Sequence, residues 1–400
     1  MTELVNAANL APTPLAMLLG TIAKEQKTAP QPASSPLTAY RGVLTPLLLD
    51  AKEREMEALV RGAAVHDLGW MRRVAVRGAD RFRWLNGMVS NTVTGLDANS
   101  GAWNLVMNAA GRIQGELYVW REGAGIDTDA LELEIAADQV DKLLAHFDRF
   151  IIMDDVQLTQ LAAGVAGEPG GVTAVGLIGP MSDSLLERVG LPTLPEPLTS
   201  GRAEWRGRAV RLLRSYGVLA PRYELWVKTE VLQALWTALR EAGATPVAAA
   251  SLESLRIAEG VPAYGTDMVE RDLPQETSQT RALHFNKGCY LGQEIVERIR
   301  TRGNVHRHLL HLELDGPLPA TGTEVKYRKA AGEEAVAGAI TSATEVRLEG
   351  SARLFALAMI SAEAEAHTPQ FTYIVNGIAG TGRILTSPPR LDLDPGQALA

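Results

Sequence analysis

Residues 281–308 of the 400-residue chain read RALHFNKGCYLGQEIVERIRTRGNVHRH. They contain the only cysteine, Cys289, and Lys287 lies two residues before it. Apolar residues recur at helical spacing as far as Arg300, which predicts that Cys289 lies at or just before the first turn of a helix. The N–H groups of a helix start and a neighbouring lysine both favour a thiolate. A lone cysteine is more often a small buried apolar residue, but this setting favours a functional thiol.

The motif inside this stretch has a known counterpart. Residues 287–294, Lys-Gly-Cys-Tyr-Leu-Gly-Gln-Glu, resemble the Lys-Gly-Cys-(Tyr/Phe)-x-Gly-Gln-Glu signature of the YgfZ-type folate-binding proteins. That family is related to the glycine-cleavage T-protein, an aminomethyltransferase, and acts in maintaining iron–sulfur enzymes, including those that modify tRNA. The resemblance covers residues 40–390. It implies that the cofactor is tetrahydrofolate or a one-carbon derivative, and that the partners are iron–sulfur client enzymes.

Composition limits the class of protein. Four hundred residues exceed what one hydrophobic core usually holds, so two or three domains are expected. The net charge of −8 argues against a polyanion binder, and a single cysteine excludes an internal disulfide or a multi-cysteine metal cage within one chain. The sequence has neither an apolar run of membrane-spanning length nor a basic signal-peptide start. We expect a cytoplasmic protein with no membrane partner, no metal site and no direct nucleic acid contact.

Local patterns predict the elements around the motif. Strands are expected at 73–77, 131–135, 173–178, 210–213 and 223–227, and helices at 15–22, 81–89, 137–147 and 231–242. After Val305 the pattern becomes alternating short strands and turns, which is typical of a small all-β domain.

The resemblance implies an α+β fold of the three-domain aminomethyltransferase (T-protein) type, built around a central hole and ending in a β-barrel. Its expected parts are a disordered or surface-laid N-terminal extension, 1–39; a split first domain of the folate-binding type, 40–74 plus 158–266; a split second domain with the Lys-Gly-Cys motif, 75–157 plus 267–305; and the C-terminal barrel, 306–400.

Several positions depart from the T-protein pattern. Where the T-protein has an acidic pair with an aspartate assigned to catalysis, this chain has Gly115 and Glu116. Ala136, Ala220 and Leu252 stand where that protein has an asparagine, a glutamate and an arginine near the folate. Each change weakens the grip on the pterin or removes an acid. We therefore expect the T-protein fold without T-protein aminomethyl transfer.

The candidate site residues form two groups. Lys287 and Cys289 are the expected working pair. The resemblance implies folate contacts by Asn108, Glu116, Arg256, Gly288, Gln293, Glu294 and Arg298. Arg256 could instead form an ion pair on a helix surface. The basic run from Arg298 to His308 is either an anion site or a solvated face.

Three functions remain open at this point. The leading hypothesis is a tetrahydrofolate-binding protein that supports assembly or repair of iron–sulfur enzymes, including tRNA-modifying ones. A folate-dependent aminomethyltransferase or methyltransferase is the alternative. A scaffold that binds a partner without a ligand is the third. The sequence does not name the client enzyme, the folate form or the oligomeric state.

Overall fold

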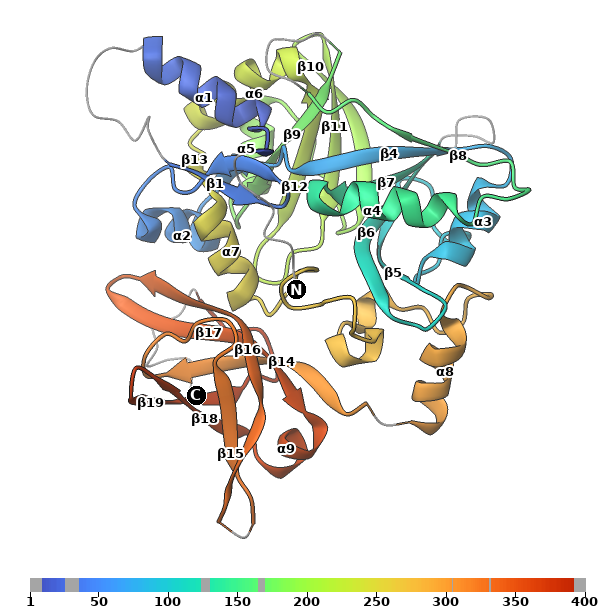
Figure 1. Cartoon of the computed structure of the whole chain (residues 1–400). Helices are drawn as coiled ribbons and strands as arrows, with labels where there is room; N and C mark the ends of the chain where they lie inside the picture. Colours follow the sequence, from blue (N-terminus) through green and yellow to red (C-terminus); the bar gives the residue numbers. More distant parts are fainter. Residues whose placement is uncertain are drawn as a thin grey trace. The chain divides into compact units, whose positions relative to one another are not determined.

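The computed structural model describes residues 9–25, 36–123, 130–164, 170–303, 305–330 and 332–391 (Figure 1). The chain divides into two compact units. Unit 1 consists of residues 1–85, 93–103 and 117–252, and unit 2 consists of residues 86–92, 104–116 and 253–400. The borders of the three expected domains and the central hole stay predictions.

Helices occur in both units. In the described residues they are α1 (Pro14–Glu25), α2 (Lys52–Arg61), α3 (Arg81–Met88), α4 (Ala137–Asp148), α5 (Ser182–Val189), α6 (Leu232–Glu241), α7 (Ala249–Ala258), α8 (Gln293–Arg302) and α9 (Ala362–His367). Short 3-10 turns are η2 (Thr229–Val231), η3 (Pro274–Thr277) and η4 (Thr280–Ala282).

A small hairpin and a large sheet supply most strands before residue 250. The hairpin pairs β1 (Leu37–Tyr40) with β2 (Val43–Pro46). The sheet contains β3 (Ala64–Asp67), β4 (Met71–Arg77), β5 (Ser100–Met107), β6 (Ile113–Glu122), β7 (Ala130–Ala136), β8 (Gln157–Gln160), β9 (Val172–Ile178), β10 (Thr199–Trp205), β11 (Arg208–Ser215), β12 (Arg222–Lys228) and β13 (Thr245–Val247). Their order is β13-β3-β9-β12-β11-β10-β5-β6-β7-β4-β8, and β5 and β6 continue into unit 2.

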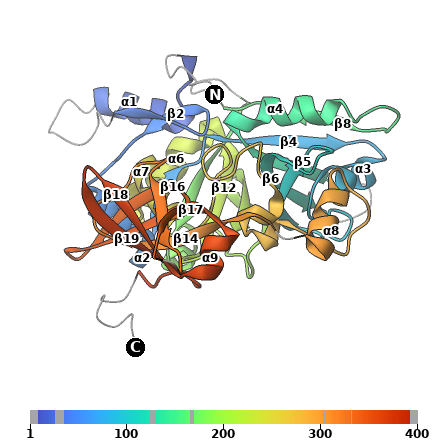
Figure 2. The ribbon, with the colours of Figure 1, turned by 60° about the horizontal axis from the view of Figure 1, so that its bottom comes forward.

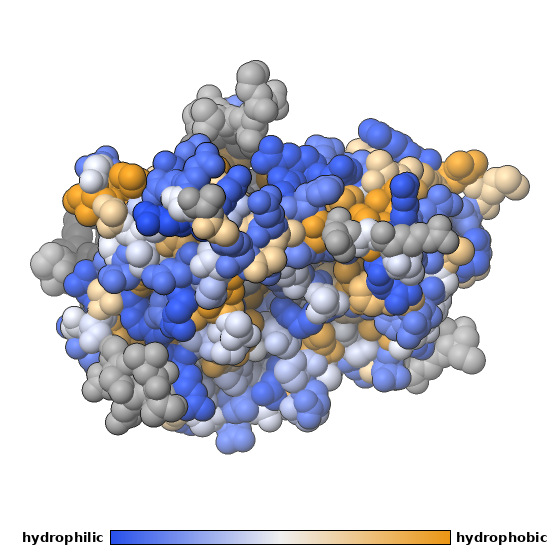
Figure 3. Space-filling model, turned by 90° about the horizontal axis from the view of Figure 1, so that it is seen from below, coloured by the Kyte–Doolittle hydropathy of each residue, from blue (hydrophilic) through white to orange (hydrophobic). Residues whose placement is uncertain are grey.

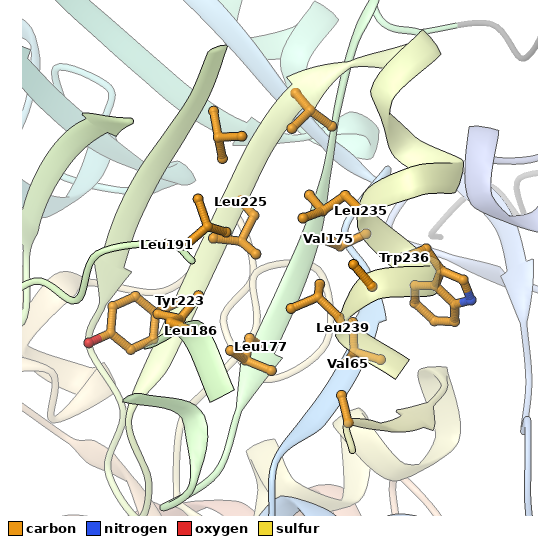
Figure 4. Close-up of a cluster of buried hydrophobic side chains, with 14 of the residues drawn as sticks. Val65, Val175, Leu177, Leu186, Leu191, Tyr223, Leu225, Leu235, Trp236 and Leu239 are labelled. Atoms are coloured by element: carbon orange, nitrogen blue, oxygen red, sulfur yellow. The ribbon is translucent and has the colours of Figure 1, made fainter. Parts of the chain in front are cut away.

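One face of this sheet packs against α6 in the main core of unit 1. Strand alternation turns Val175, Leu177 and Leu225 to the same side, and helical spacing turns Leu235 and Leu239 toward them (Figure 4). These five side chains are fully buried. Burying each contributes about 1.5–3 kcal/mol relative to leaving it exposed.

The alternate positions of the same sheet carry charged side chains that are also buried. Arg73 on β4 and Arg211 on β11 both pair with Glu132 on β7. Glu134 on β7 and Glu224 on β12 are hydrogen-bonded to each other. Burial is the main cause that raises the pKa of both carboxyl groups, because desolvation disfavours the charged form. This carboxyl pair therefore keeps a proton to a higher pH than an exposed glutamate does.

Part of the N-terminal extension is integrated into unit 1, which differs from the disordered or surface-laid segment expected. Leu15 on α1 is fully buried in the main core. Thr13 donates a hydrogen bond from its hydroxyl to the buried Asp67, and its N–H donates to Leu44 O at 2.9 Å. An apolar helix face with a buried polar anchor explains why this segment packs. Residues 1–8 and 26–35 lie outside the described residues.

Unit 2 contains a closed six-stranded barrel, which confirms the expected C-terminal β-barrel. Its strands, in the order in which they pair, are β14 (Arg307–Asp315), β17 (Ser351–Ser361), β16 (Glu334–Leu348), β15 (Glu324–Arg328), β18 (Gln370–Val375) and β19 (Ile378–Ile384). Alternation builds its core: on β18, Phe371 and Tyr373 are buried while Gln370 and Thr372 are exposed. Within unit 2, α8 stands apart from the barrel (Figure 2).

Hydrophilic residues dominate the face shown in Figure 3, where hydrophobic ones form smaller separate areas. The most exposed large apolar side chains in the described part of the chain are Ile152 and Met153, after α4. Among the described helices, none has the length and apolarity needed to cross a bilayer.

Candidate functional site

The Lys-Gly-Cys motif lies in a loop of unit 2 between η4 and α8. Backbone hydrogen bonds tie this loop to the segment 86–92 at both ends: His284 N–H donates to Ser90 O at 3.1 Å, and Leu291 N–H donates to Gly87 O at 2.9 Å. The Asn91 side chain also donates to Arg281 O at 2.9 Å. The loop is therefore held in one conformation by main-chain groups on either side of the motif.

Lys287 is directed into this fixed loop. Its Nζ donates to the backbone oxygens of Val89 at 2.7 Å and Asn91 at 2.5 Å. It also lies 5.0 Å from the centre of the Tyr290 ring. Desolvation by burial lowers the pKa of Lys287 to about 7. The side chain is therefore an amine–ammonium couple that titrates near neutral pH.

The ring of Tyr290 packs against the Lys287 amine and is held in place by its own contacts. It is buried with Met107 and Val296, and its N–H donates to the side-chain oxygen of Gln293 at 3.1 Å. Burial, with a smaller contribution from Glu297, raises the pKa of Tyr290 to about 12. The phenol stays neutral over the physiological range, and its ring can stabilise a cation at Lys287.

Cys289 is exposed in this loop. Helix α8 begins at Gln293, so the thiol precedes the helix by more than the sequence pattern predicted. The reason is Gly292, which caps the helix in a left-handed conformation with φ of +82°. A Cβ at Gly292 would lie 2.7 Å from Asn108 O, so only glycine permits this close approach. At Gly288, the residue before Cys289, a Cβ would meet nothing within 4 Å, so that position borders open space.

Asn108 and Glu116 both lie in unit 2, Asn108 beside Gly292 and Glu116 beside Tyr264. The Asn108 carboxamide oxygen accepts from the N–H groups of Ala110 and Arg112, each at 3.0 Å, and so shapes its own turn. Glu116, at the start of β6, accepts from Tyr264 N–H at 3.0 Å. Their expected folate contacts stay predictions.

Arg256 is part of a buried ion pair rather than a solvent-facing one. Its guanidinium donates to Asp267 at 2.6 Å and to Val261 O at 2.6 Å, and it also pairs with Glu253. The Asp267 carboxylate in turn accepts from the hydroxyls of Thr341 and Ser342 on β16, each at 2.6 Å. Arg256 therefore joins α7 to the barrel through Asp267. Its expected role in holding folate is a prediction that these contacts do not support.

The other expected residues lie on α8. Gln293 caps the turn at Tyr290, whereas Glu294 and Arg298 are exposed. Three residues of the basic run are paired with acids: Arg300 with Glu297, Arg307 with Asp272 and Glu276, and His308 with Glu365. The side chain of Arg302 lies outside the described residues. Arg298 and His306 of this run are both exposed, and the permanently charged Arg298 could bind an anionic ligand.

Sequence reasoning missed the groups that surround Lys287. They are backbone carbonyls of residues 89 and 91, and a carbonyl leaves no signature in the residue type. Nothing in the residue pattern indicates that Tyr290 lies under the amine. Within the described ranges, no three His, Cys, Asp or Glu side chains gather in a way that could hold a metal ion.

The site offers two reactive groups on one fixed loop. The Lys287 amine can exchange a proton near neutral pH, and the Cys289 thiol is accessible to a reagent or a partner. A neutral amine and an accessible thiol are both nucleophiles, so the loop is equipped for covalent chemistry or for binding an anion.

Comparison with known proteins supports the resemblance at the level of the fold. An aminomethyltransferase of Rubrobacter xylanophilus is 27% identical over 342 residues, covering 82% of this chain and 84% of the relative. One from Thermus thermophilus is 28% identical over 76% of this chain and 81% of the relative. The crystal structure of glycine cleavage system aminomethyltransferase T from Bartonella henselae has a TM-score of 0.79 at 16% identity, covering 95% of this chain and 98% of that one.

These matches confirm the expected α+β aminomethyltransferase-like fold with its C-terminal barrel. The family described as the GCVT N-terminal domain matches residues 38–287, which is more than half of the chain. The chain therefore belongs to the GCVT N-terminal domain family.

Proposed function

We propose that this protein binds tetrahydrofolate, or a one-carbon derivative of it, and supports the assembly or repair of iron–sulfur enzymes, including tRNA-modifying ones. The observation that carries the proposal is the fixed loop on which the partly buried amine of Lys287 stands two residues from the exposed thiol of Cys289. Its support is the YgfZ-type signature on that loop, in a chain of the GCVT family.

The residues of unit 2 fit the proposed ligand. The ammonium form of Lys287 has three N–H donors, and two are engaged by backbone carbonyls, so the third suits a carboxylate or carbonyl oxygen. Arg298 on α8 has the charge that the acidic tail of a folate requires. The carboxylate of Glu116 is the type of acceptor that pterin N–H groups need. When bound, the folate would supply a carrier for a one-carbon unit.

The T-protein positions that are apolar here argue against aminomethyl transfer. Ala136 is 6%, Ala220 6% and Leu252 8% exposed, so all three are packed in the interior. None has a polar atom in its side chain with which to orient a pterin. These three positions therefore favour a role other than T-protein aminomethyl transfer.

A folate-dependent aminomethyltransferase or methyltransferase is the second candidate, because the relatives named above are aminomethyltransferases. An assay of folate-dependent one-carbon transfer by the purified protein separates the two. We expect tetrahydrofolate to bind without turnover. Turnover at the rate of a glycine-cleavage T-protein would favour the second candidate.

Complementation tests the role of the motif. In a deletion strain, Cys289→Ala and Lys287→Ala should each lower the activity of iron–sulfur enzymes, and the double variant should be little worse because the two act as a unit. Lys326→Ala on β15 is the matched control. Full rescue by Cys289→Ala, or a loss of rescue that merely follows a lower melting temperature, would defeat the proposal.

A further inference from the structure

We propose that Lys287 is a nucleophilic amine that condenses with a small aldehyde to form an imine. The inference rests on the proposed function and deepens it by naming the class of substrate that the motif would take. It is carried by the way in which the loop holds the nitrogen.

The two backbone carbonyls bind the N–H groups of the Lys287 amine and leave its lone pair available. A neutral primary amine has two N–H groups and one lone pair. Nζ of Lys287 directs its two hydrogen bonds at Val89 O and Asn91 O. Since both N–H groups are used, tetrahedral geometry leaves the lone pair directed away from the carbonyls. The backbone thus presents the nucleophilic side of the nitrogen and restricts its rotation.

The surroundings favour the neutral form without excluding a reagent. Desolvation lowers the pKa of Lys287 to about 7, and no other cause is resolved. On its own loop, Tyr290, whose ring centre lies 5.0 Å from Nζ, stays neutral, and Cys289 follows two residues later in the sequence. From α8, Glu297 and Arg300 act on Tyr290 with opposite signs. The next residue, Gly288, borders open space, and Cys289 is exposed, so a reagent can reach this part of the loop.

The chemistry requires no oxidant or reductant. The lone pair of Nζ attacks the carbonyl carbon, and a proton from nitrogen passes to the carbonyl oxygen to give a carbinolamine. Loss of that hydroxyl with a second proton releases one water and forms the C=N bond. The Tyr290 ring stabilises the positive charge that nitrogen carries in the protonated imine.

Reductive trapping tests the inference on the full chain. The protein is treated with glyoxylate and cyanoborohydride at pH 7, and carboxymethylated lysines are mapped by peptide mass spectrometry. At this pH about half of an amine with a pKa near 7 is neutral, against about one part in 2,500 for an ordinary lysine. We expect Lys287 to be labelled at least about tenfold faster than Lys228 and Lys326, with a rate that levels off above pH 7–8.

The internal lysines serve as controls within one sample, and Lys287→Arg should remove only the fast label. Labelling of Lys287 that is no faster than that of Lys228, or that rises steadily to pH 10, would overturn the inference. Tetrahydrofolate calorimetry on the same preparation separates the two proposals. Folate binding without fast labelling removes only the imine, whereas fast labelling without folate binding removes only the proposed function.

Discussion

Glu134 and Glu224 share a proton between two buried carboxyl groups, and this makes stability depend on pH. Trp120 donates to Glu134 at 2.7 Å and Trp226 donates to Glu224 at 3.0 Å. Because the folded pKa of Glu134 is raised, the native state holds a proton that the unfolded chain has already released. The free energy of unfolding should therefore fall as pH rises from the unfolded pKa toward the folded one, by up to about 1.4 kcal/mol per pH unit.

The variant Glu134→Gln tests this pair. The amide can still donate to Glu224 but does not titrate. In urea unfolding, the stability of the variant should therefore change less with pH than that of the wild type. Relative to the wild type, the variant should be more stable at pH 8 than it is at pH 5. Glu57→Gln, an exposed position on α2, is the control for loss of one charge. If the wild type and Glu134→Gln gave parallel pH profiles of unfolding free energy, protonation of this carboxyl pair would not contribute to stability.

Arg256 is expected to affect stability more than folate binding. Arg256→Ala leaves Asp267, 2% exposed, without its cationic partner, which should cost about 3–5 kcal/mol. The exposed pair of Arg347 and Glu345 is the matched control, since Arg347→Ala should cost less than about 1 kcal/mol. Urea unfolding measures both. A stable Arg256→Ala protein with weakened tetrahydrofolate affinity would restore the ligand role inferred from the sequence.

At the residue scale, the sequence made Lys287 and Cys289 the candidate pair because their types and spacing are distinctive. It could not decide between the two roles of Arg256, because the contacts that bury its partner Asp267 come from residues distant in sequence. Its partner Asp267 is bound by Thr341 and Ser342, which lie 74 and 75 residues further along. Nor could residue types reveal that backbone carbonyls hold the Lys287 amine.

At the element scale, helix α1 is expected to stabilise unit 1. Leu15→Ala removes a fully buried side chain from the main core and should lower the free energy of unfolding by about 2–5 kcal/mol. Met17, on the same helix, is 39% exposed, and Met17→Ala should cost far less. Equal effects of the two changes in urea unfolding would mean that α1 does not pack as described.

The start of α8 depends on one glycine. Gly292→Ala places a Cβ at 2.7 Å from Asn108 O in a left-handed conformation, so we expect a loss of about 1–3 kcal/mol or more. Gly288→Ala adds the same atom where nothing lies within 4 Å, and the fold should tolerate it. Thermal melting of the two variants provides the comparison. A Gly292→Ala protein as stable as Gly288→Ala would contradict this account of the cap.

Elements with strong periodicity were predictable, and those fixed by long-range contacts were not. The helix predicted at 137–147 is α4 (Ala137–Asp148), because its apolar positions recur at a spacing of three and four residues. The helix expected at 15–22 extends over Pro14–Glu25, since tertiary packing stabilises turns that local propensity does not. The sequence pattern did not predict β19, which pairs with both β18 and β14 in the closed barrel.

At the scale of the whole molecule, the fold class followed from the family resemblance and was confirmed by the comparisons. Division into compact parts was less accessible to sequence reasoning. The segments 86–92 and 104–116 belong to unit 2, although they are enclosed in sequence by unit 1. They bond to residues far along the chain, as Glu116 does with Tyr264, or lie beside the loop of Lys287. No local composition change marks such borders.

Calorimetric titration of the purified full chain with tetrahydrofolate tests the central claim most directly. The account predicts a saturable heat of binding, retained in Lys326→Ala and weakened in Lys287→Ala, because the Lys287 ammonium has a donor left for the ligand. Both variants must first melt at the wild-type temperature. The absence of any saturable heat with folded wild-type protein would contradict the claim that this is a folate-binding protein.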